Sequence, residues 1–293
     1  MTQIHTQHPN EQINFNLMVQ TQVKTALDED IGSGDLTAQL IPLTQTATAK
    51  VIIREQAIIC GIAWFNECFK QIDADVKIDW LVAEGDQTEP NQTLCTIQGF
   101  ARSLLTAERC ALNFLQTLSA TATASHQYAM AIKGTSAQIL DTRKTIPNLR
   151  LAQKYAVTVG GGYNQRLALY DGILIKENHI AAAGSINNVM QQAFALNSGK
   201  SIQIEVETLA QLQQALDAGA TNILLDNFNP DQLLKAVHLN KTAGLKAVLE
   251  ASGGITLSNV REIAQTGVDR ISIGAITKDI DAIDLSMQFT HSA

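Results

Sequence analysis

The sequence predicts an α/β protein of two parts, in which a mixed N-terminal half is followed by a C-terminal half with parallel strands. The chain has 293 residues, roughly twice the length of an average domain. After about residue 137, short apolar runs alternate with amphipathic segments, which is typical of a parallel α/β barrel or a doubly wound sheet. The preceding residues lack this regular alternation, so we expect an α+β arrangement there.

The N-terminal half carries helical and strand patterns in turn. Residues 1–14 are polar and predict a loose tail. Beyond them, helical patterns occupy 15–28 and 61–72, strand patterns occupy 47–60 and 76–98, and a long helical pattern runs from 103 to 125. Turn residues at 84–86 and 90–91 divide the second strand pattern into a hairpin-like pair. The long helix has no breaker, so we expect it to be able to bridge the two parts.

The C-terminal half contains six short apolar runs, each of strand length. They lie at 137–144, 173–179, 202–207, 222–227, 247–254 and 270–275. Amphipathic segments of helical length separate them, near 149–158, 185–197, 208–218, 230–243 and 258–266. The units share no sequence motif, so the repeat is one of structure.

Charge and composition exclude several classes of protein. A net charge of −7 lacks the basic footprint that nucleic acids and anionic membranes require. We expect neither a signal peptide nor a membrane-spanning helix, because the N-terminus is polar and no apolar run approaches 18 residues. The four cysteines form no C-x-x-C pair, so no zinc site or disulfide framework is predicted. We expect reduced thiols in a cytoplasmic protein.

Polar residues follow five of the six apolar runs. They are Asp141–Lys144, Lys176–His179, Glu205 with Glu207, Asp226 with Asn227, and Glu250 with Ser252–Gly254, while the sixth run ends in Ser272, Ile273 and Gly274. A single polar residue at a strand end more often only contacts water than takes part in a functional site. In an α/β barrel, however, working residues lie at the C-terminal ends of the strands. Acidic and basic residues at several ends therefore indicate one shared site.

Residues 141–179 are basic within an acidic chain, with six Lys and Arg against three Asp and Glu. Such a pocket predicts a small polyanionic ligand, because Arg binds carboxylate or phosphate with its planar fork and Lys adds a compact charge. A solvated helix face is the alternative, and we expect Lys154 to lie on such a face.

Two carboxylates and several glycines add to this site. Glu205 and Asp226 follow consecutive strands, which in a parallel sheet lie ~5 Å apart. They could hold a metal together with sugar hydroxyls, stabilise a developing cation, act as acid and base, or pair with Lys144 or Lys176. Glycine-rich stretches at 160–162, 252–254 and 272–275 suit phosphate binding by backbone N–H groups, with ordinary turns as the alternative.

Two neighbouring segments, DTRKTIPNLRLAQKYAVTVGGGYNQR and LIKENH, form the most distinctive pattern in the chain. Around them, in order, stand EDIGSGDLT, ARSLLTAERCALNFLQ, EVETL, LLDN, LEASGGIT and GVDRISIGAIT. Together these motifs resemble the quinolinate phosphoribosyltransferase family, the carboxylating nicotinate-nucleotide pyrophosphorylases. Their joint specificity is high, although no single motif would suffice.

The resemblance implies a fold and a reaction. The family fold is an N-terminal α/β sandwich followed by an open, incomplete α/β barrel. Applied to this chain, it implies a sandwich over 1–112, a barrel over 113–275 and a tail, 276–293, that returns to the sandwich. The implied reaction joins quinolinate and phosphoribosyl pyrophosphate, with Mg²⁺, into nicotinate mononucleotide, pyrophosphate and carbon dioxide in NAD biosynthesis. The family assembles as homodimers or multiples of dimers.

The resemblance also implies roles for individual residues. Arg143, Arg166 and Lys176 match positions that hold the substrate carboxylates, with Lys144 beside the ribose and pyrophosphate and Thr142 and Gln165 in the same substrate site. Glu205 and Asp226 match the carboxylates on the ribose and metal side, and Ser252, Gly253, Gly254 and Gly274 match the 5′-phosphate site. The implied catalytic residues are Lys144, Lys176, Glu205 and Asp226. Arg109, which alone would be interpreted as a surface charge, matches an arginine that the partner subunit contributes.

The chain departs from the family at Gln165, where the usual Asn-His-Arg becomes Asn164-Gln165-Arg166. Glutamine keeps hydrogen bonding but carries no positive charge. We hypothesise a weaker grip on one substrate carboxylate, or a shifted pH dependence. The Gln165→His variant is therefore expected to have a changed KM for quinolinate, and an unchanged KM would count against the hypothesis. A second departure is Asn148 in place of a usual glycine, which Asn tolerates because it adopts the left-handed conformation.

Three other functions remain open from the residues. A paralogue of the same fold, found with molybdate-transport genes, could act on another substrate, although Arg109, Arg143, Lys144 and Lys176 favour quinolinate. A Schiff-base lyase could use Lys144 or Lys176 as nucleophile, but nearby carboxylates should keep a lysine charged. A non-catalytic module could bind anions, but it would not need Glu205 and Asp226 in the same pocket.

Overall fold

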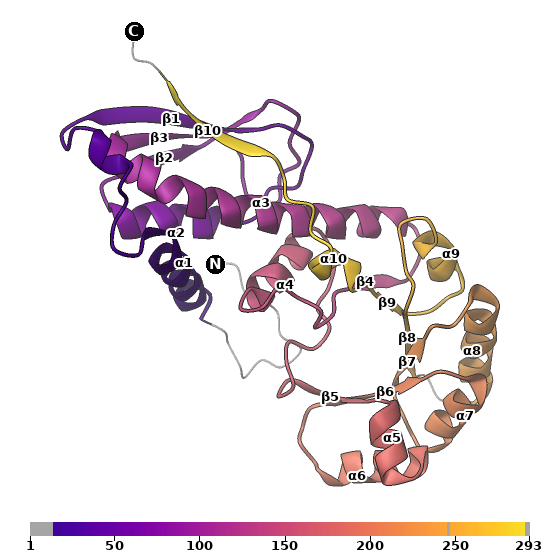
Figure 1. The fold of residues 1–293 in the computed structure, drawn as a ribbon. Coiled ribbons are helices and arrows are strands. Elements are labelled where there is room, and N and C mark those ends of the chain that lie inside the picture. Colours follow the sequence, from indigo (N-terminus) through magenta and orange to yellow (C-terminus); the bar gives the residue numbers. More distant parts are fainter. Residues whose placement is uncertain (1–13, 245–246, 291–293) are drawn as a thin grey trace. The chain divides into compact units, whose positions relative to one another are not determined.

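The computed structural model describes residues 14–244 and 247–290, which fall into two compact units (Figure 1). Of the described residues, 14–124, 146–160 and 280–290 form the first unit, and 125–145, 161–244 and 247–279 form the second. The helix α3 (Ala101–Ala131) contributes residues to both. The boundary expected between residues 112 and 113 falls inside this helix.

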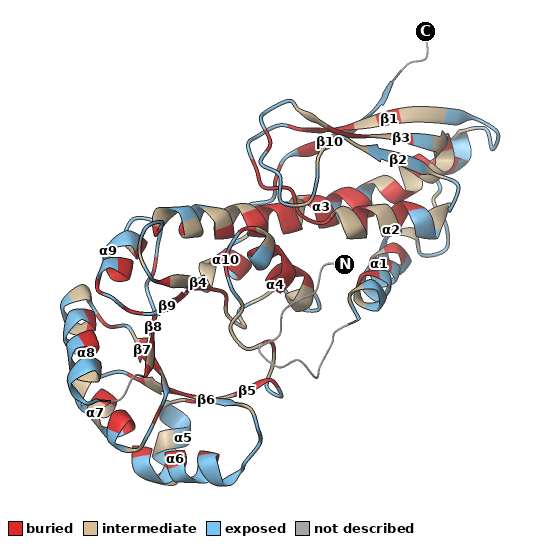
Figure 2. Ribbon diagram, turned by 180° about the vertical axis from the view of Figure 1, so that it is seen from behind, coloured by how far each residue is buried: buried red, intermediate tan, exposed pale blue. Residues whose placement is uncertain are grey.

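The first unit is built on a four-stranded antiparallel sheet. In sheet order its strands are β10 (Leu285–Thr290), β1 (Thr46–Ile53), β3 (Thr93–Phe100) and β2 (Lys77–Trp80). Its helices are α1 (Phe15–Ile31), α2 (Ile62–Ile72), the N-terminal part of α3, α4 (Arg150–Val159) and the short 3-10 helix η1 (Ala38–Leu40). Figures 1 and 2 show α2 and α3 along one face of this sheet, which makes the unit a two-layer sandwich.

Side chains from the sheet and from all these α-helices share one core. Val51 and Ile53 of β1 and Trp64 of α2 are completely buried. Burying an aliphatic side chain of this size stabilises a fold by about 1.5–3 kcal/mol. The rings of Phe15 and Tyr155 lie 5.4 and 5.6 Å from that of Trp64, so α1, α2 and α4 meet at one aromatic cluster. This cluster explains why α4, distant in sequence, belongs to the first unit.

The environment of α4 corrects one expectation. Lys154 was expected on a solvated helix face, but its side chain is completely buried, and that prediction is wrong. All residues from Ala152 to Val157 are buried, and Ala152, Tyr155 and Ala156 belong to the core of the first unit. The turn that precedes α4 contains Asn148 with a φ of 63°, the left-handed conformation that was expected of it.

The second unit is built on six parallel strands. In sheet order they are β4 (Gln138–Leu140), β9 (Arg270–Ser272), β8 (Val248–Ser252), β7 (Asn222–Asp226), β6 (Ser201–Val206) and β5 (Gly172–Ile175). The helices are α5 (Glu177–Ala183), α6 (Ile186–Ala195), α7 (Leu209–Asp217), α8 (Pro230–Thr242), α9 (Val260–Gln265) and α10 (Ala275–Lys278). Figure 1 shows the sheet curving, with α5 to α9 on its outer side.

The two edges of this sheet, β4 and β5, do not pair with each other within the described part of the chain. The segment before β5 reaches both of them. Tyr163 donates its N–H to Ile139 O at 2.8 Å beside β4, and Arg166 donates through Nη1 to Gly172 O of β5 at 2.8 Å. Residues 163–166 therefore occupy the opening between the edge strands.

The predicted fold class, a mixed N-terminal unit and a C-terminal parallel α/β unit, is confirmed. Each predicted strand of the C-terminal half overlaps an observed one. Four elements were not predicted, namely η1, α5, α10 and β10. The residues 177–179, interpreted as a polar strand end, begin α5. Among the residues that the structure describes, no helix is both long and apolar enough to span a membrane.

All four cysteines are buried as free thiols, namely Cys60, Cys68, Cys95 and Cys110. Burial raises the pKa of Cys95 to about 12 and that of Cys110 to about 11. Because the thiolate is the reactive form, we expect no thiol of the native protein to react with Ellman's reagent within minutes at pH 8. Unfolding in guanidinium should expose all four. A stoichiometric fast reaction in the native protein would contradict this burial.

Candidate active site

A cavity of about 430 Å³ lies within the second unit at the C-terminal ends of its parallel strands. It is lined by Thr142, Arg143, Lys144, Gln165, Arg166, Leu174, Lys176, Glu205, Leu224, Asp226, Glu250, Ser252 and Ser272. The strand residues among them share one face of the sheet, because they alternate along each strand and stand opposite one another in register. Thus Leu224 pairs with both Glu205 and Glu250, and Ser252 pairs with both Asp226 and Ser272.

The structure brings most of the sequence-predicted site residues to this cavity. Those lining it are Thr142, Arg143, Lys144, Gln165, Arg166, Lys176, Glu205, Asp226 and Ser252. Gly253 and Gly254 directly follow Ser252, and Gly274 lies two residues after Ser272. Arg109 is not among the lining residues; it is an exposed residue of α3 in the first unit.

Two polar residues of the cavity were noted in the sequence only as strand-end residues and were given no role in the site. Glu250 is 1% exposed and Ser272 is 4% exposed. Glu250 stands two residues before Ser252, and side chains two apart in a strand share a face. The same alternation places Gln203 on the same face of β6 as Glu205, two residues nearer the start of the strand.

Two of the basic side chains that line the cavity, Arg143 and Arg166, lie close enough to interact. Arg166 is held by its bond to Gly172 O, and burial together with the nearby charge of Arg143 lowers the pKa of its guanidinium. The Nε atom of Arg143 is buried and has no hydrogen-bond partner among the described residues. A buried, unpartnered donor beside a second cation indicates that an anion is the missing acceptor.

The carboxylates lie on the neighbouring strands β6 and β7. Glu205 forms an ion pair with Lys176, with 3.0 Å between Nζ of the lysine and Oε2 of the glutamate. Of the two lysine partners considered for these carboxylates, Lys176 is thus the one that Glu205 contacts. Asp226 accepts a hydrogen bond of 2.7 Å from the side-chain nitrogen of Asn227. This ion pair also argues against Lys176 as a Schiff-base nucleophile, since an ammonium group held by a carboxylate lacks a free lone pair.

The loop after β8 requires its glycine, and the loop after β9 packs tightly against a lysine side chain at Gly274. At Gly253, with a φ of +93°, an added Cβ would lie 2.1 Å from Oδ1 of Asn227. At Gly274 an added Cβ would lie 3.0 Å from Cδ of Lys144. Glycines in loops at strand ends let a phosphate approach backbone N–H groups closely, which is how phosphate is bound in many barrels. The hydroxyl of Ser272 lies beside these loops and has no hydrogen-bond partner within the described residues.

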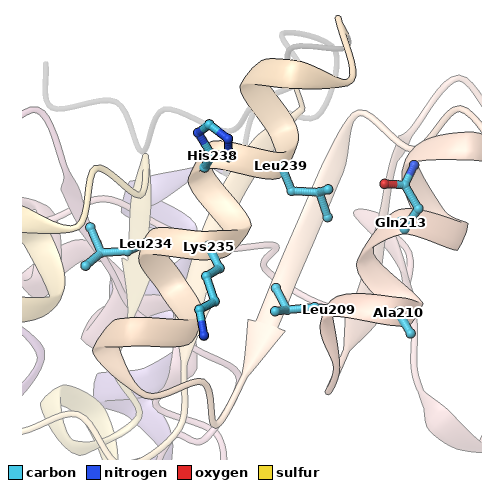
Figure 3. Close-up of a pocket in the computed structure, with 7 residues that line it drawn as sticks. All are labelled: Leu209, Ala210, Gln213, Leu234, Lys235, His238 and Leu239. Carbon is cyan, nitrogen blue, oxygen red and sulfur yellow. The ribbon is translucent and has the colours of Figure 1, made fainter.

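A larger depression of about 620 Å³ lies between α7 and α8. Figure 3 shows Leu209 and Leu239 between these two helices, with Lys235 and His238 extending from α8. Its lining is mainly apolar and contains no acidic residue, and it lies on the helices rather than at the strand ends. The smaller cavity therefore has the stronger claim to be the active site, because charged groups of both signs converge there.

Comparison with known proteins assigns the family. The model of "Quinolinate phosphoribosyl transferase, C-terminal domain" matches residues 121–288, and that of the N-terminal domain matches residues 35–119. The chain belongs to the quinolinate phosphoribosyltransferase family. The resemblance predicted from the sequence motifs is thereby confirmed.

Individual relatives agree with this assignment. The chain is 40% identical to a probable nicotinate-nucleotide pyrophosphorylase [carboxylating] of Bacillus subtilis, over 90% of this chain and 91% of the relative. It is 38% identical to the nicotinate-nucleotide pyrophosphorylase [carboxylating] of Mycobacterium leprae, over 90% and 95%. The solved structure of the nicotinate-nucleotide pyrophosphorylase from Francisella tularensis superposes with a TM-score of 0.91 at 44% identity, covering 98% of this chain and all of the other.

Proposed function

We propose that this quinolinate phosphoribosyltransferase family member transfers the phosphoribosyl group of phosphoribosyl pyrophosphate to quinolinate with decarboxylation. The products are nicotinate mononucleotide, pyrophosphate and carbon dioxide, as in de novo NAD biosynthesis. One observation supports this proposal best. The cavity at the strand ends combines Arg143, Arg166 and Lys176 with the carboxylates Glu205 and Asp226. An anion-binding module would need the cations but not the two acidic groups.

The cationic end of the cavity suits quinolinate, which carries two adjacent carboxylates. Guanidinium groups bind carboxylates with two parallel hydrogen bonds, and Arg143 has a buried Nε available for one of them. Arg166 is fixed by Gly172 O and Lys176 by Glu205, so both cations are oriented before substrate binds. Prior orientation of this kind reduces the entropic cost of reaching the reactive geometry.

The acidic groups suit the sugar. When the bond from C1′ of the ribose to pyrophosphate breaks, positive charge develops on the ribose, and a nearby carboxylate stabilises it. The quinolinate nitrogen then forms its bond to C1′ and becomes a pyridinium. Loss of the 2-carboxylate as carbon dioxide leaves its electron pair on the pyridinium ring, and the ring carbon takes up a proton. No covalent bond to the protein is needed.

The donor set fits a magnesium ion that arrives with the substrate. Within the described residues, no three His, Cys, Asp or Glu side chains cluster to hold a metal. Mg²⁺ is commonly bound by one or two carboxylates together with substrate phosphates and water, and Glu205 and Asp226 could supply the former. When bound, Mg²⁺ would neutralise charge on the pyrophosphate. The 5′-phosphate we assign to Ser252, Gly253, Gly254 and Gly274, with Lys144 and Thr142 alongside the ribose and pyrophosphate.

We further propose a homodimer or a multiple of dimers in the cytoplasm, in which Arg109 enters the partner subunit's site. Its exposed position on α3 is compatible with that role. Inactive Arg109→Ala and Arg143→Ala proteins, mixed and allowed to exchange subunits, should regain part of the wild-type activity, because some sites would then contain both arginines. Failure to regain activity despite demonstrated subunit exchange would place Arg109 in the site of its own subunit and contradict this assignment.

The proposed reaction is tested with a direct assay. The protein is supplied with quinolinate, phosphoribosyl pyrophosphate and Mg²⁺, and nicotinate mononucleotide and carbon dioxide are measured, with nicotinate replacing quinolinate in a parallel sample. Turnover of quinolinate alone would support the proposal. A folded protein that turns over neither compound would contradict it and favour a paralogue with another substrate. Binding of both substrates without turnover would indicate an anion-binding module.

A further inference from the structure

Three side chains form a hydrogen-bonded chain at the base of the cavity. Gln203 of β6 donates through Nε2 to Oε2 of Glu250 on β8 at 2.9 Å. Gln165 donates through Nε2 to Oε1 of Gln203 at 2.6 Å, and the same nitrogen lies 3.5 Å from Oε1 of Glu250. Gln203 is 8% exposed and Glu250 is 1% exposed, so both are shielded from water.

Glu250 sets the direction of every bond in this chain. A carboxylate accepts hydrogen bonds and donates none, whereas an amide group can be turned to present either its oxygen or its nitrogen. Both oxygens of Glu250 face amide nitrogens, so the nitrogen of Gln203 must point to Glu250 and its oxygen to Gln165. Gln165 consequently presents its nitrogen to Gln203 and its oxygen to the backbone N–H of Arg166, at 2.6 Å.

This chain of hydrogen bonds ends at segment 164–166, which carries the guanidinium group of Arg166. The backbone N–H of Gln165 and the side chain of Asn164 also donate to the buried Asp141, at 2.8 and 2.7 Å. Segment 164–166 is thus held on one side by Asp141 and on the other by the chain from Glu250. The guanidinium of Arg166 extends from this segment to Gly172 O, so the segment's orientation determines where that cation lies.

We propose that Glu250 is a positioning residue for quinolinate binding, acting through Gln203 and Gln165 on the segment that carries Arg166. The inference rests on the proposed function, because it takes Arg166 as a ligand of the substrate carboxylates. It also gives the departure at Gln165 a physical role. An uncharged amide completes a chain that is oriented by one buried carboxylate, where a cationic side chain would add a charge beside Arg143 and Arg166.

The first test is the Glu250→Gln variant, which keeps the volume and removes the directionality. Whichever way the new amide turns, its –NH₂ group faces the amide nitrogen of Gln165 or of Gln203. If it faces Gln203, that glutamine and then Gln165 must turn over; if it faces Gln165, the 3.5 Å contact between the two side chains has no acceptor. In either orientation Gln165 loses its carboxylate acceptor, so the bond from the N–H of Arg166 to its side-chain oxygen is no longer fixed. We expect the KM for quinolinate to rise about tenfold, as for the loss of a hydrogen bond to a charged group, and the KM for phosphoribosyl pyrophosphate to stay within about twofold.

The second test moves the negative charge from residue 250 to residue 203, its neighbour in the chain of hydrogen bonds. In the double variant Glu250→Gln with Gln203→Glu, the carboxylate at position 203 accepts from both neighbouring amides, so Gln165 keeps its original orientation. We expect this double variant to restore the KM for quinolinate to within about threefold of wild type. If Glu250→Gln does not fold, the double variant decides alone. The control is Glu262→Gln on α9, an exposed glutamate outside the cavity, for which neither KM should change.

A measurement without turnover separates this inference from the proposed function. In protein labelled with ¹⁵N in glutamine, the side-chain amide of Gln165 should exchange slowly with solvent in wild type and in the double variant, and quickly in Glu250→Gln. A wild-type protein that makes no product would overturn the proposed function while leaving this exchange pattern to decide the role of Glu250. Unchanged KM values in folded Glu250→Gln, or a double variant that fails to recover, would overturn the inference.

Discussion

The Glu205→Gln variant is expected to lose about 10²–10³ in kcat for nicotinate mononucleotide formation, because electrostatic stabilisation of a developing charge is worth that much in buried sites. Glutamine keeps the volume of the side chain and removes its charge. In the transition state the ribose becomes cationic as pyrophosphate departs, whereas in the bound substrate it is neutral. A group that acts on this difference lowers kcat when it is removed, and it changes KM much less.

Glu205 also holds Lys176 at 3.0 Å, so the variant could act by releasing that lysine. The two effects have different kinetic signatures. A released Lys176 would weaken quinolinate binding and raise its KM, while kcat would fall little. The matched control is Glu207→Gln, which removes the same charge from an exposed residue two positions further along the chain. Steady-state kinetics with both substrates varied would reveal which applies, and a pure KM effect would contradict a role for Glu205 in the chemistry.

The fold of the second unit could be predicted because its strands are nearly continuous apolar runs that end in polar residues. A parallel strand buried on both faces needs such a run, and helices cover the outer face of this sheet (Figure 1). The element bounds were less accurate. Segment 173–179 was predicted as one run, yet β5 ends at Ile175 and α5 begins at Glu177. A strand end and the first turn of the next helix have similar polar composition, so periodicity alone does not separate them.

The burial of Lys154 and the strand β10 were not predicted because both depend on tertiary packing. Lysine is a residue type that usually lies on the surface, but Lys154 belongs to a run of six buried residues in α4, and no local pattern contains that information. β10 is likewise stable only because β1 offers it an edge, pairing Thr48 with Thr290 through Ile53 with Leu285. An edge strand of this kind forms because a neighbouring strand offers it hydrogen bonds, and its own sequence gives little sign of it.

The charged residues of the site could be predicted from the sequence, whereas the hydrogen bonds that hold them in place could not. Charged groups at strand ends stand out in an otherwise apolar pattern, which is why Lys176, Glu205 and Asp226 could be singled out. Gln203 and Glu250 lie one step deeper on the same face, where a polar side chain requires a hydrogen-bonded partner. Sequence shows that such a residue is polar but not which partner it has, so the chain from Glu250 to Gln165 required the structure.

The Gly253→Ala variant is expected to lower kcat/KM for phosphoribosyl pyrophosphate by about 100-fold, since displacements near 1 Å at a reacting group cost that much. The new Cβ would lie 2.1 Å from Oδ1 and 2.7 Å from Cγ of Asn227, distances that real side chains do not tolerate. Either the Gly253 loop or Asn227 must move. Both outcomes disturb the site, because the loop follows Ser252 and the side chain of Asn227 donates to Asp226 at 2.7 Å.

Alanine at a positive φ is also strained, so the clash must be separated from the strain. Gly219 provides the control, since its φ is +82° and an added Cβ would meet nothing within 4 Å. Gly219→Ala should therefore lose about 1–2 kcal/mol of stability, measured by chemical unfolding, and keep its activity. Gly253→Ala should lose at least as much stability and the activity as well. Equal activity in the two variants would show that close approach at Gly253 has no functional role.

A double-mutant cycle then tests whether Asn227 is the obstacle. Asn227 has a φ of 57°, a conformation that glycine adopts without strain, so Asn227→Gly removes the side chain while retaining the backbone. If the clash with Oδ1 and Cγ causes the loss, adding Gly253→Ala to Asn227→Gly should cost much less in kcat/KM than adding it to the wild-type protein. The contact of 3.0 Å to the backbone nitrogen of Asn227 would remain, so recovery should be incomplete. Fully additive losses would instead assign the effect to the conformation of Gly253 itself, because residues that interact through a contact are not additive.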